Sequence, residues 1–314
     1  MKVVEDITTI YYVAISGLQK CVRRGDFEGA SRMWRVASRI KAKEAHARLY
    51  TILFEDCGRD YRCLQFFHNW RGSLKSTDDG LRLVKALCES TKSRDAHAAS
   101  KFITGKAPIT SYVRSTINFS KYWANLGWVQ ASWNSQGFDV YNKFKFVPEK
   151  QWVVDFCINT SKYDRSSMSA SIPMFHAIDC TEVYQQVPEE CGLNEYYEGI
   201  PLEALDKHTR PGLTVLGEVY NELRSELIGI GITSYCFGMY VFMNEGRLLT
   251  NKVLGEIDFW ALCSKVKAWD CFEISNRVTY FKDVVQLKLN TSRVDYLNDF
   301  SDGLLEGMLR RMNT

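Results

Sequence analysis

The sequence predicts a mainly α-helical protein, and three observations lead to this prediction. Apolar residues recur at helical spacing from residue 7 to about residue 104. Glycine and aspartate interrupt that pattern at the points where helices would end and begin. Pro108 then ends the helical array, and the composition changes after it. We therefore expect a helical N-terminal domain at 1–105 and a larger second domain at 106–314, which is aromatic-rich and either helical or α+β.

The first two expected helices flank the dipeptide Gly25-Asp26, in which the glycine stops one helix and the aspartate can cap the next. The apolar face of the first helix consists of Ile10, Ala14, Leu18, Cys21 and Val22. The residues expected to point inward from the second helix are Phe27, Ala30, Met33, Trp34 and Ala37. Both faces follow the spacing of an amphipathic helix.

A third expected helix ends in the stretch TILFEDCGRD at 51–60. Its apolar stripe consists of Ala45, Leu49, Ile52 and Leu53. The adjacent acids Glu55 and Asp56 could be a catalytic pair, metal ligands or a helix end, and Gly58 occupies the position of a left-handed C-cap. A helical hairpin should follow, with its hinge at STKS, 90–93.

Several function classes find no support in the motifs. The ten cysteines form no CxxC pair, and no HxH or HExxH spacing occurs, so we expect free thiols, a reducing cytoplasm and no metal. The ATP-binding pattern GxxxxGK[ST] is absent, and we expect no cofactor. The longest apolar run, at 227–243, is broken by glycines and polar residues, so the chain is expected neither to be secreted nor to span a membrane.

Charge is distributed unevenly along the chain. Residues 1–125 contain 22 Lys and Arg against 12 Asp and Glu, a balance of +10, which leaves 18 against 25, or −7, for residues 126–314. A basic N-terminal part is typical of proteins that bind nucleic acid or an acidic partner, although solvated basic helix faces would give the same balance.

The basic residues chosen as DNA contacts lie in three short runs. On a helix, Arg32, Arg35 and Arg39 share one face, which suits consecutive phosphates or, alternatively, an acidic protein surface. The remaining members of the set are Lys20, Arg23, Arg24, Lys92 and Arg94.

Eight large aromatic residues crowd 119–156 among lysines and asparagines. Aromatic rings can stack on unpaired bases while lysines follow the backbone, or the rings can form a domain core. We favour the core for most of them and keep Lys121, Trp123 and Trp128 as candidate DNA contacts.

One polar cluster, PLEALDKHTRPG at 201–212, gathers an acid, a base and a cation. Asp206 could orient His208 as a general base while Arg210 holds a phosphate. The favoured alternative is a loop closed by Pro211-Gly212, in which these side chains cap backbone groups.

The segments YYVAISGLQKCVRRGDFEGASRMWRVASRI, ARLYTILFEDCG and ALCESTKS, within 10–104, resemble in order and spacing the C-terminal, non-ATPase region of the RarA/MgsA family. That family consists of clamp-loader-like AAA+ replication-associated recombination proteins. IPLEALDKHTRPGLTVLGE, from residue 200 onward, is a weaker match. The resemblance implies a helical, clamp-loader-collar-like domain in which Glu55 and Asp56 close a helix. The family's ATPase module has no counterpart in this sequence, and 106–200 is unmatched.

From this resemblance we expect a non-catalytic DNA replication or recombination accessory protein, and a virus-encoded, stand-alone collar would fit the missing ATPase module. It would self-associate as a homo-oligomer and bind DNA or a replication protein, with no membrane as partner. The alternative is a nucleic-acid- or nucleotide-processing enzyme with its chemistry around Asp206, His208 and Arg210.

Overall fold

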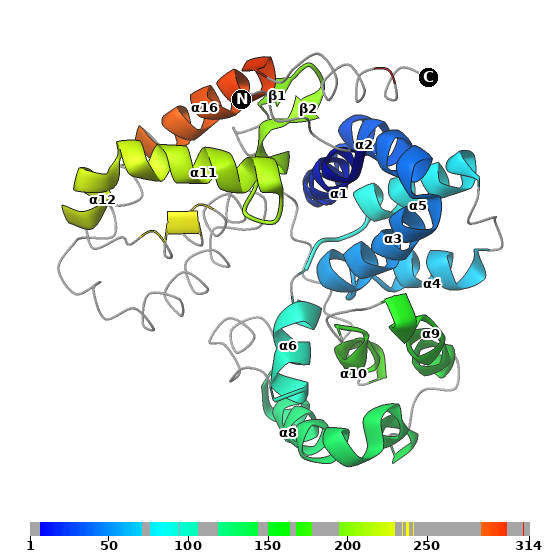
Figure 1. Cartoon of the computed structure of the whole chain (residues 1–314). Coiled ribbons are helices and arrows are strands. Elements are labelled where there is room, and N and C mark those ends of the chain that lie inside the picture. The colour runs from blue at the N-terminus through cyan, green and yellow to red at the C-terminus, as the bar shows by residue number, and fades with distance from the viewer. Residues whose placement is uncertain are drawn as a thin grey trace. The chain divides into compact units, whose positions relative to one another are not determined.

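The computed structural model describes most of the N-terminal half of the chain and shorter stretches after it (Figure 1). The described residues are 7–70, 76–93, 95–105, 119–143, 150–163, 168–177, 195–229, 234, 237–238, 241, 284–299 and 310. These residues are mainly helical, which confirms the predicted fold class at that level.

Contacts divide the chain into two compact units whose boundaries differ from the expected division near residue 105. The first unit combines residues 1–45 with 189–314, and the second consists of residues 46–188. The first unit is therefore assembled from both ends of the sequence.

The first unit begins with two helices that pack against each other, α1 (Ile7–Arg24) and α2 (Phe27–Ile40). Gly25 has φ 72°, and the Asp26 carboxylate accepts a hydrogen bond of 2.8 Å from Gly29 N, so the predicted stop and cap are confirmed. All residues predicted for the apolar face of α1 are buried. The same holds for α2, except that Phe27 is 39% exposed, so its predicted inward position is wrong.

The rest of the first unit comes from the C-terminal part of the chain. Strands β1 (Tyr196–Tyr197) and β2 (Ile200–Pro201) pair antiparallel, with Tyr196 opposite Pro201. A short 3-10 helix and three α-helices complete the described elements, namely η5 (Leu202–Ala204), α11 (Arg210–Glu222), α12 (Arg224–Gly229) and α16 (Gln286–Asp299). Helices α11 and α16 run side by side, and η5 contacts both α1 and α16 (Figure 1).

The second unit is a set of short helices. It begins within α3 (Ala42–Asp56), which crosses the unit boundary, and continues through α4 (Tyr61–Asn69), α5 (Thr77–Glu89), α6 (Asp95–Ile103), α8 (Phe119–Gln136), η1 (Gly137–Lys143), α9 (Trp152–Thr160), η3 (Ser161–Tyr163), η4 (Met168–Ser171) and α10 (Ile172–Ala177). The predicted stripe of α3 is buried, and the predicted hinge after Glu89 separates α5 from α6.

Aromatic rings from several helices form much of the core of the second unit. The Tyr50 ring lies 5.4 Å from that of Phe67 and 5.0 Å from that of Tyr163. Trp152 of α9 contacts both Tyr61 and Phe156. Phe156 is buried and Trp152 is half-buried, so this end of the aromatic-rich segment lies at the edge of the core.

The stretch 51–60 ends α3, but Gly58 does not have the left-handed conformation predicted for it, since the described glycines with positive φ do not include it. An added Cβ at Gly58 would overlap Ile172 Cδ1 and lie 2.9 Å from Phe54 O. A residue with a Cβ would therefore collide with these atoms, which explains why position 58 is a glycine. The acid that caps a helix here is Asp60, whose carboxylate accepts from Cys63 N at 2.9 Å and from Thr91 N at 2.7 Å.

Candidate functional site

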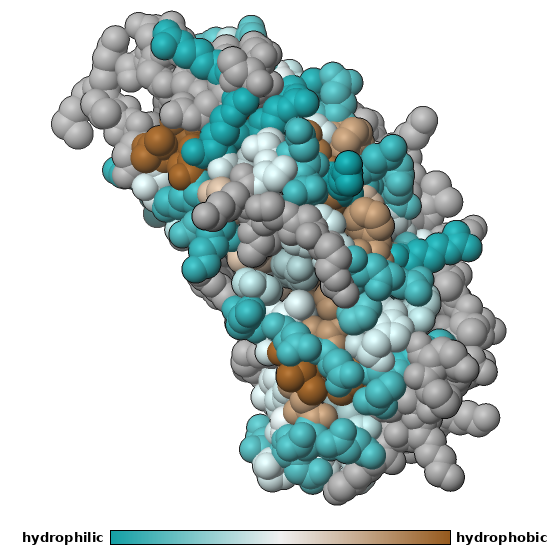
Figure 2. All heavy atoms as spheres, turned by 90° about the vertical axis from the view of Figure 1, so that its right-hand side faces the viewer, coloured by the Kyte–Doolittle hydropathy of each residue, from teal (hydrophilic) through white to brown (hydrophobic). Residues whose placement is uncertain are grey.

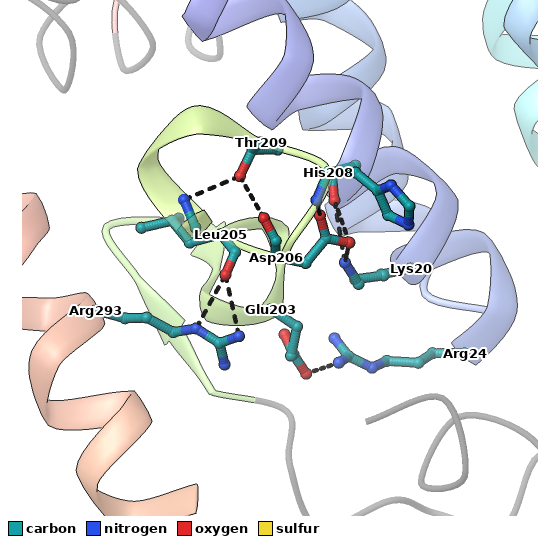
Figure 3. A network of polar contacts seen from close by, with 10 residues as sticks. Lys20, Arg24, Glu203, Leu205, Asp206, His208, Thr209 and Arg293 are labelled. Carbon is teal, nitrogen blue, oxygen red and sulfur yellow. Dashed lines mark hydrogen bonds and ion pairs between the residues drawn. The ribbon is translucent and has the colours of Figure 1, made fainter. Parts of the chain in front are cut away.

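Two buried ion pairs connect α1 to the segment that follows β2 in the first unit (Figure 3). Lys20 Nζ contacts an Asp206 carboxylate oxygen, and each side chain is 5% exposed. One turn further along α1, the Arg24 guanidinium contacts the Glu203 carboxylate, with exposures of 6% and 3%. The i, i+4 spacing places both cations on the same side of α1.

The Asp206 carboxylate is fully engaged by its neighbours. One oxygen accepts from Lys20 Nζ and, at 3.2 Å, from Ser16 Oγ, while the other accepts from His208 N at 2.8 Å. Burial raises the pKa of Asp206, but the charge and hydrogen bond of Lys20 and the His208 N–H together outweigh it and hold the pKa below its usual value. Asp206 is therefore ionised at neutral pH.

The same segment forms the N-terminus of α11. Thr209 Oγ1 accepts from Gly212 N at 3.1 Å and donates to Asp206 O at 3.0 Å, so it caps the helix and closes the turn. Gly212 lies directly against this turn, since an added Cβ would overlap the Asp206 backbone. From α16, the buried Arg293 guanidinium donates to Leu205 O at 3.3 and 3.1 Å (Figure 3).

These contacts bear on the alternative catalytic centre. The Asp206 carboxylate holds Lys20 and a backbone N–H, which is the capping role that the sequence analysis favoured. His208 and Arg210 are exposed, so they lie at the surface rather than in a closed site. The geometry favours a structural role for this loop, and a reaction at His208 and Arg210 stays the weaker hypothesis.

Four residues chosen as DNA contacts are inaccessible. Lys20 and Arg23 are buried, and the Arg24 side chain is held in its ion pair with Glu203. Lys92 is 4% exposed, and its Nζ donates to backbone carbonyls at the end of α5. For Lys20, Arg24 and Lys92 the physical reason is the same, because each finds oxygen partners within its own unit. A DNA role for these four residues is therefore not maintained.

The arginine face of α2 is more accessible. Arg32 is paired with Glu28 at 2.7 Å, and its guanidinium lies 5.9 Å from the centroid of the Tyr196 ring. Arg35 is half-buried and has no ion-pair partner among the described residues, while Arg39 is exposed. Two arginines, one turn apart, thus reach the surface of α2.

The other predicted contacts lie in the second unit. Trp128 of α8 is 37% exposed. Lys121 and Trp123 belong to the same helix, but their side chains fall outside the described part of the structure, as does Arg94.

Near the end of α2, the first unit exposes an aromatic ring that the sequence analysis did not single out. The Tyr12 ring is 51% exposed, and Lys41 Nζ lies 5.9 Å from its centroid and 5.1 Å from that of Tyr11. Lys43 is also exposed. Tyr12 lies off the apolar face of α1, which was the signal available in the sequence. We call this surface the α2 edge, and it consists of Tyr12, Arg35, Arg39, Lys41 and Lys43.

Regrouping the charges by unit removes most of the asymmetry seen along the chain. Residues 46–188 contain 18 Lys and Arg against 13 Asp and Glu, or +5, and the first unit contains 22 against 24, or −2. The basic N-terminal helices share their unit with acids from the C-terminal part. A basic surface is therefore a local feature, such as the α2 edge, rather than a property of a whole domain.

The described part of the chain gives no sign of a metal centre, since no three His, Cys, Asp or Glu side chains are grouped to hold an ion. His176 is buried with Nε2 2.9 Å from Gly58 O, and burial lowers its pKa to about 4, so it is neutral. Across the described helices, none has the length and hydrophobicity needed to cross a bilayer. On the face shown in Figure 2, hydrophilic side chains dominate and hydrophobic ones form separate small groups.

Comparison with known proteins found no matching family model, no matching curated protein and no matching solved structure. The fold and the site thus define a mainly helical protein in which buried ion pairs join α1 to the segment that follows β2.

Proposed function

We propose that this chain is a DNA replication or recombination accessory protein that self-associates and binds DNA rather than transforming it. The resemblance of 10–104 to the non-ATPase region of the RarA/MgsA family supports the cellular role. The observation that carries the DNA-binding part is the α2 edge, where Lys41 lies near the exposed Tyr12 ring and further cations of the same segment reach the surface.

The α2 edge has the two components that a nucleic-acid strand requires. Arg35 and Arg39 are four residues apart on α2, so they project from the same face about one turn apart and suit neighbouring phosphates. Lys41 and Lys43 continue the positive charge beyond the end of this helix. The exposed Tyr12 ring offers a surface on which an unpaired base can stack.

The test compares two double variants with the same change in charge. Arg35→Ala/Arg39→Ala removes the two arginines of the α2 edge, and Arg62→Ala/Arg82→Ala removes two exposed arginines from α4 and α5. Fluorescence anisotropy with labelled single-stranded and double-stranded oligonucleotides gives affinity at several salt concentrations. On duplex DNA, each lost phosphate contact should reduce the log–log salt slope by about 0.9, so the first variant should lose about two units.

The control variant should keep the slope of the unmodified protein. Equal weakening by both variants would show that binding follows total charge and would reject the α2 edge. No salt-sensitive binding by the unmodified protein would reject the DNA-binding proposal itself. The Arg32 pair with Glu28 is left intact in both variants, so folding should be unaffected.

Self-association is tested separately by light scattering at micromolar concentration. We expect a mass that is a multiple of 36.2 kDa. A monomer at the highest attainable concentration would contradict this part of the proposal and leave the DNA-binding part standing.

A further inference from the structure

Within the α2 edge, one exposed aromatic ring lies beside one ammonium group, and their geometry bears on which form of DNA the edge binds. The Tyr12 ring meets the Tyr11 ring edge to face, with 5.5 Å between the centroids and 69° between the planes. Lys41 Nζ lies 5.1 Å from the Tyr11 centroid and 5.9 Å from the Tyr12 centroid. The end of α2 thus brings a cation to two rings of α1.

The Tyr12 ring is held on one side and open elsewhere. The three distances are nearly equal, so Tyr11 and Lys41 approach the Tyr12 ring from the same general direction. Tyr11 is 6% exposed and anchors this side of the pair in the core, whereas Tyr12 is 51% exposed. The accessible area of Tyr12 therefore faces away from Tyr11 and Lys41. A ring that is supported on one side and open on the other has the arrangement of a stacking platform.

The positive charge beside this ring is available to a ligand. The backbone N–H of Lys41 donates to Ala37 O at 2.9 Å, which fixes the start of the side chain at the last turn of α2. Lys43 follows two residues later and is exposed. Among the described residues, no carboxylate forms an ion pair with Lys41 or Lys43. A phosphate can therefore bind Lys41 next to a group that is stacked on Tyr12.

An exposed ring and an exposed cation differ in what they can bind on DNA. In a duplex the base faces are covered by neighbouring base pairs, so side chains reach phosphates and groove edges but no base face. In a single strand the base faces are accessible to aromatic side chains, while cations follow the backbone. The cations of the α2 edge can thus serve both forms of DNA, whereas Tyr12 serves only the single strand.

We propose that the ligand of the α2 edge is single-stranded DNA, in which an unpaired base stacks on the open side of the Tyr12 ring while Lys41 binds an adjacent phosphate. This inference rests on the proposed DNA-binding function and specifies the form of DNA that the edge takes. Stacking uses the face of a base rather than its hydrogen-bonding edge, so the site accepts different bases. It requires the ring of Tyr12 and not its hydroxyl group.

The first experiment removes the ring or only its hydroxyl group, with Tyr12→Ala and Tyr12→Phe. Fluorescence anisotropy gives the affinity for a labelled single strand without self-complementarity and for the duplex that it forms with its complement. Tyr12→Ala should weaken single-strand binding by about 5- to 150-fold, the range for one stacked base, and leave duplex binding unchanged. Tyr12→Phe should bind both forms as the unmodified protein does.

A strand with the same phosphates but abasic sugars separates stacking from charge. The unmodified protein should bind the abasic strand more weakly than the normal strand. This difference should shrink in Tyr12→Ala, because that variant has no ring on which a base could stack. The salt dependence of single-strand binding should be unchanged in Tyr12→Ala, whereas Lys41→Gln should reduce its log–log slope by about 0.7 for one lost phosphate contact.

Phe66 of α4 provides a matched control for an exposed ring. Its side chain is 42% exposed, but it belongs to the second unit and not to the α2 edge. Phe66→Ala should therefore leave both affinities unchanged. Circular dichroism of each variant checks that the helical content is retained.

Two sets of results would overturn the inference and leave the DNA-binding proposal standing. The first is an equal effect of Tyr12→Ala on single-strand and duplex binding, including no effect on either. The second is a loss in Phe66→Ala as large as that in Tyr12→Ala. An unchanged slope in Lys41→Gln would remove Lys41 from the site. By contrast, an unmodified protein that binds neither oligonucleotide in a salt-sensitive manner would reject the proposed function itself.

Discussion

The two units bury a lysine by different means. Lys20 and Lys92 are each 4% exposed. Lys20 faces the Asp206 carboxylate, 186 residues away in the sequence, and also donates to Ser16 Oγ at 3.0 Å. Lys92 instead binds carbonyls that lie within five residues of it, at the end of α5. One charge is thus stabilised by a long-range ion pair and the other by the local negative end of a helix.

The comparison extends to the cysteines near these lysines. In the first unit, burial and then the Asp26 carboxylate raise the pKa of Cys21, while in the second unit Cys63 and then Lys92 outweigh burial and lower the pKa of Cys57. Both thiols are fully buried, so burial alone does not determine their chemistry. Their neighbours contribute as well.

The largest effect is expected from Lys20→Met. This change leaves the Asp206 carboxylate buried without its cation, and breaking a buried pair in this way costs roughly 3–5 kcal/mol of unfolding free energy. Urea unfolding followed by circular dichroism measures the loss. Adding Asp206→Asn should recover much of it, because the amide oxygen can still accept from His208 N. A double variant no more stable than Lys20→Met would show that the charge of Asp206 is not the cause.

A smaller loss is expected from Lys92→Met. Here the substitution removes a charge and leaves only carbonyl groups unsatisfied, at a cost of about 1–3 kcal/mol. The same urea experiment compares it directly with Lys20→Met. If Lys92→Met is the more damaging change, the helix terminus stabilises the lysine more strongly than the ion pair does.

The close packing of the turn around Asp206 is tested by replacing two glycines of α11 with alanine, one at a time. Gly212→Ala places a Cβ against the Asp206 backbone and should destabilise by about 1–3 kcal/mol, as overpacking does. Gly217→Ala is the control, because nothing lies within 4 Å of its added Cβ, and alanine should stabilise the helix by up to about 1 kcal/mol. Thermal unfolding should therefore shift in opposite directions. Equal shifts would contradict the close approach at Gly212.

The smallest effect is a dependence of stability on pH that belongs to the first unit. The pKa of folded Asp206 lies below the ordinary value of 3.8, so its ionised form stabilises the fold above that value, and this contribution disappears as the pH falls through the folded-state pKa. Asp206→Asn lacks the contribution at every pH. The stability difference between the two proteins should therefore be fully present at pH 6 and decrease as the pH falls below 3.8. A constant difference would show that Asp206 is not ionised in the folded protein.

Helices and their buried faces were predictable because they depend on neighbours in the sequence. Spacing alone identified the buried faces of α1 and α3, and Asp26 caps α2 as expected. The predicted burial of Phe27 and the predicted left-handed conformation of Gly58 were wrong, because both depend on tertiary contacts. Helical periodicity does not show that the first turn of α2 reaches solvent, and a cap-like glycine position does not show that Ile172 lies against it.

The candidate sites were less predictable, because accessibility depends on partners far away in the chain. The sequence identified the cluster at 201–212 and favoured a capping role, which agrees with the bonds of Asp206 and Thr209. It gave no sign that Lys20 would be the partner of Asp206.

The sequence by itself determined where the N-terminal helices lie, which of their faces are apolar and where Gly25 and Asp26 separate two of them, since periodicity and caps act within a few residues. Only the tertiary structure decided which charges are available to a ligand. Counting charge along the sequence indicated a basic N-terminal part. In the folded protein, however, Asp206 and Glu203 lie against α1 and remove Lys20 and Arg24 from solvent. The physical reason is that a buried charge requires a compensating partner, and the fold, not the order of residues, determines which partner is near.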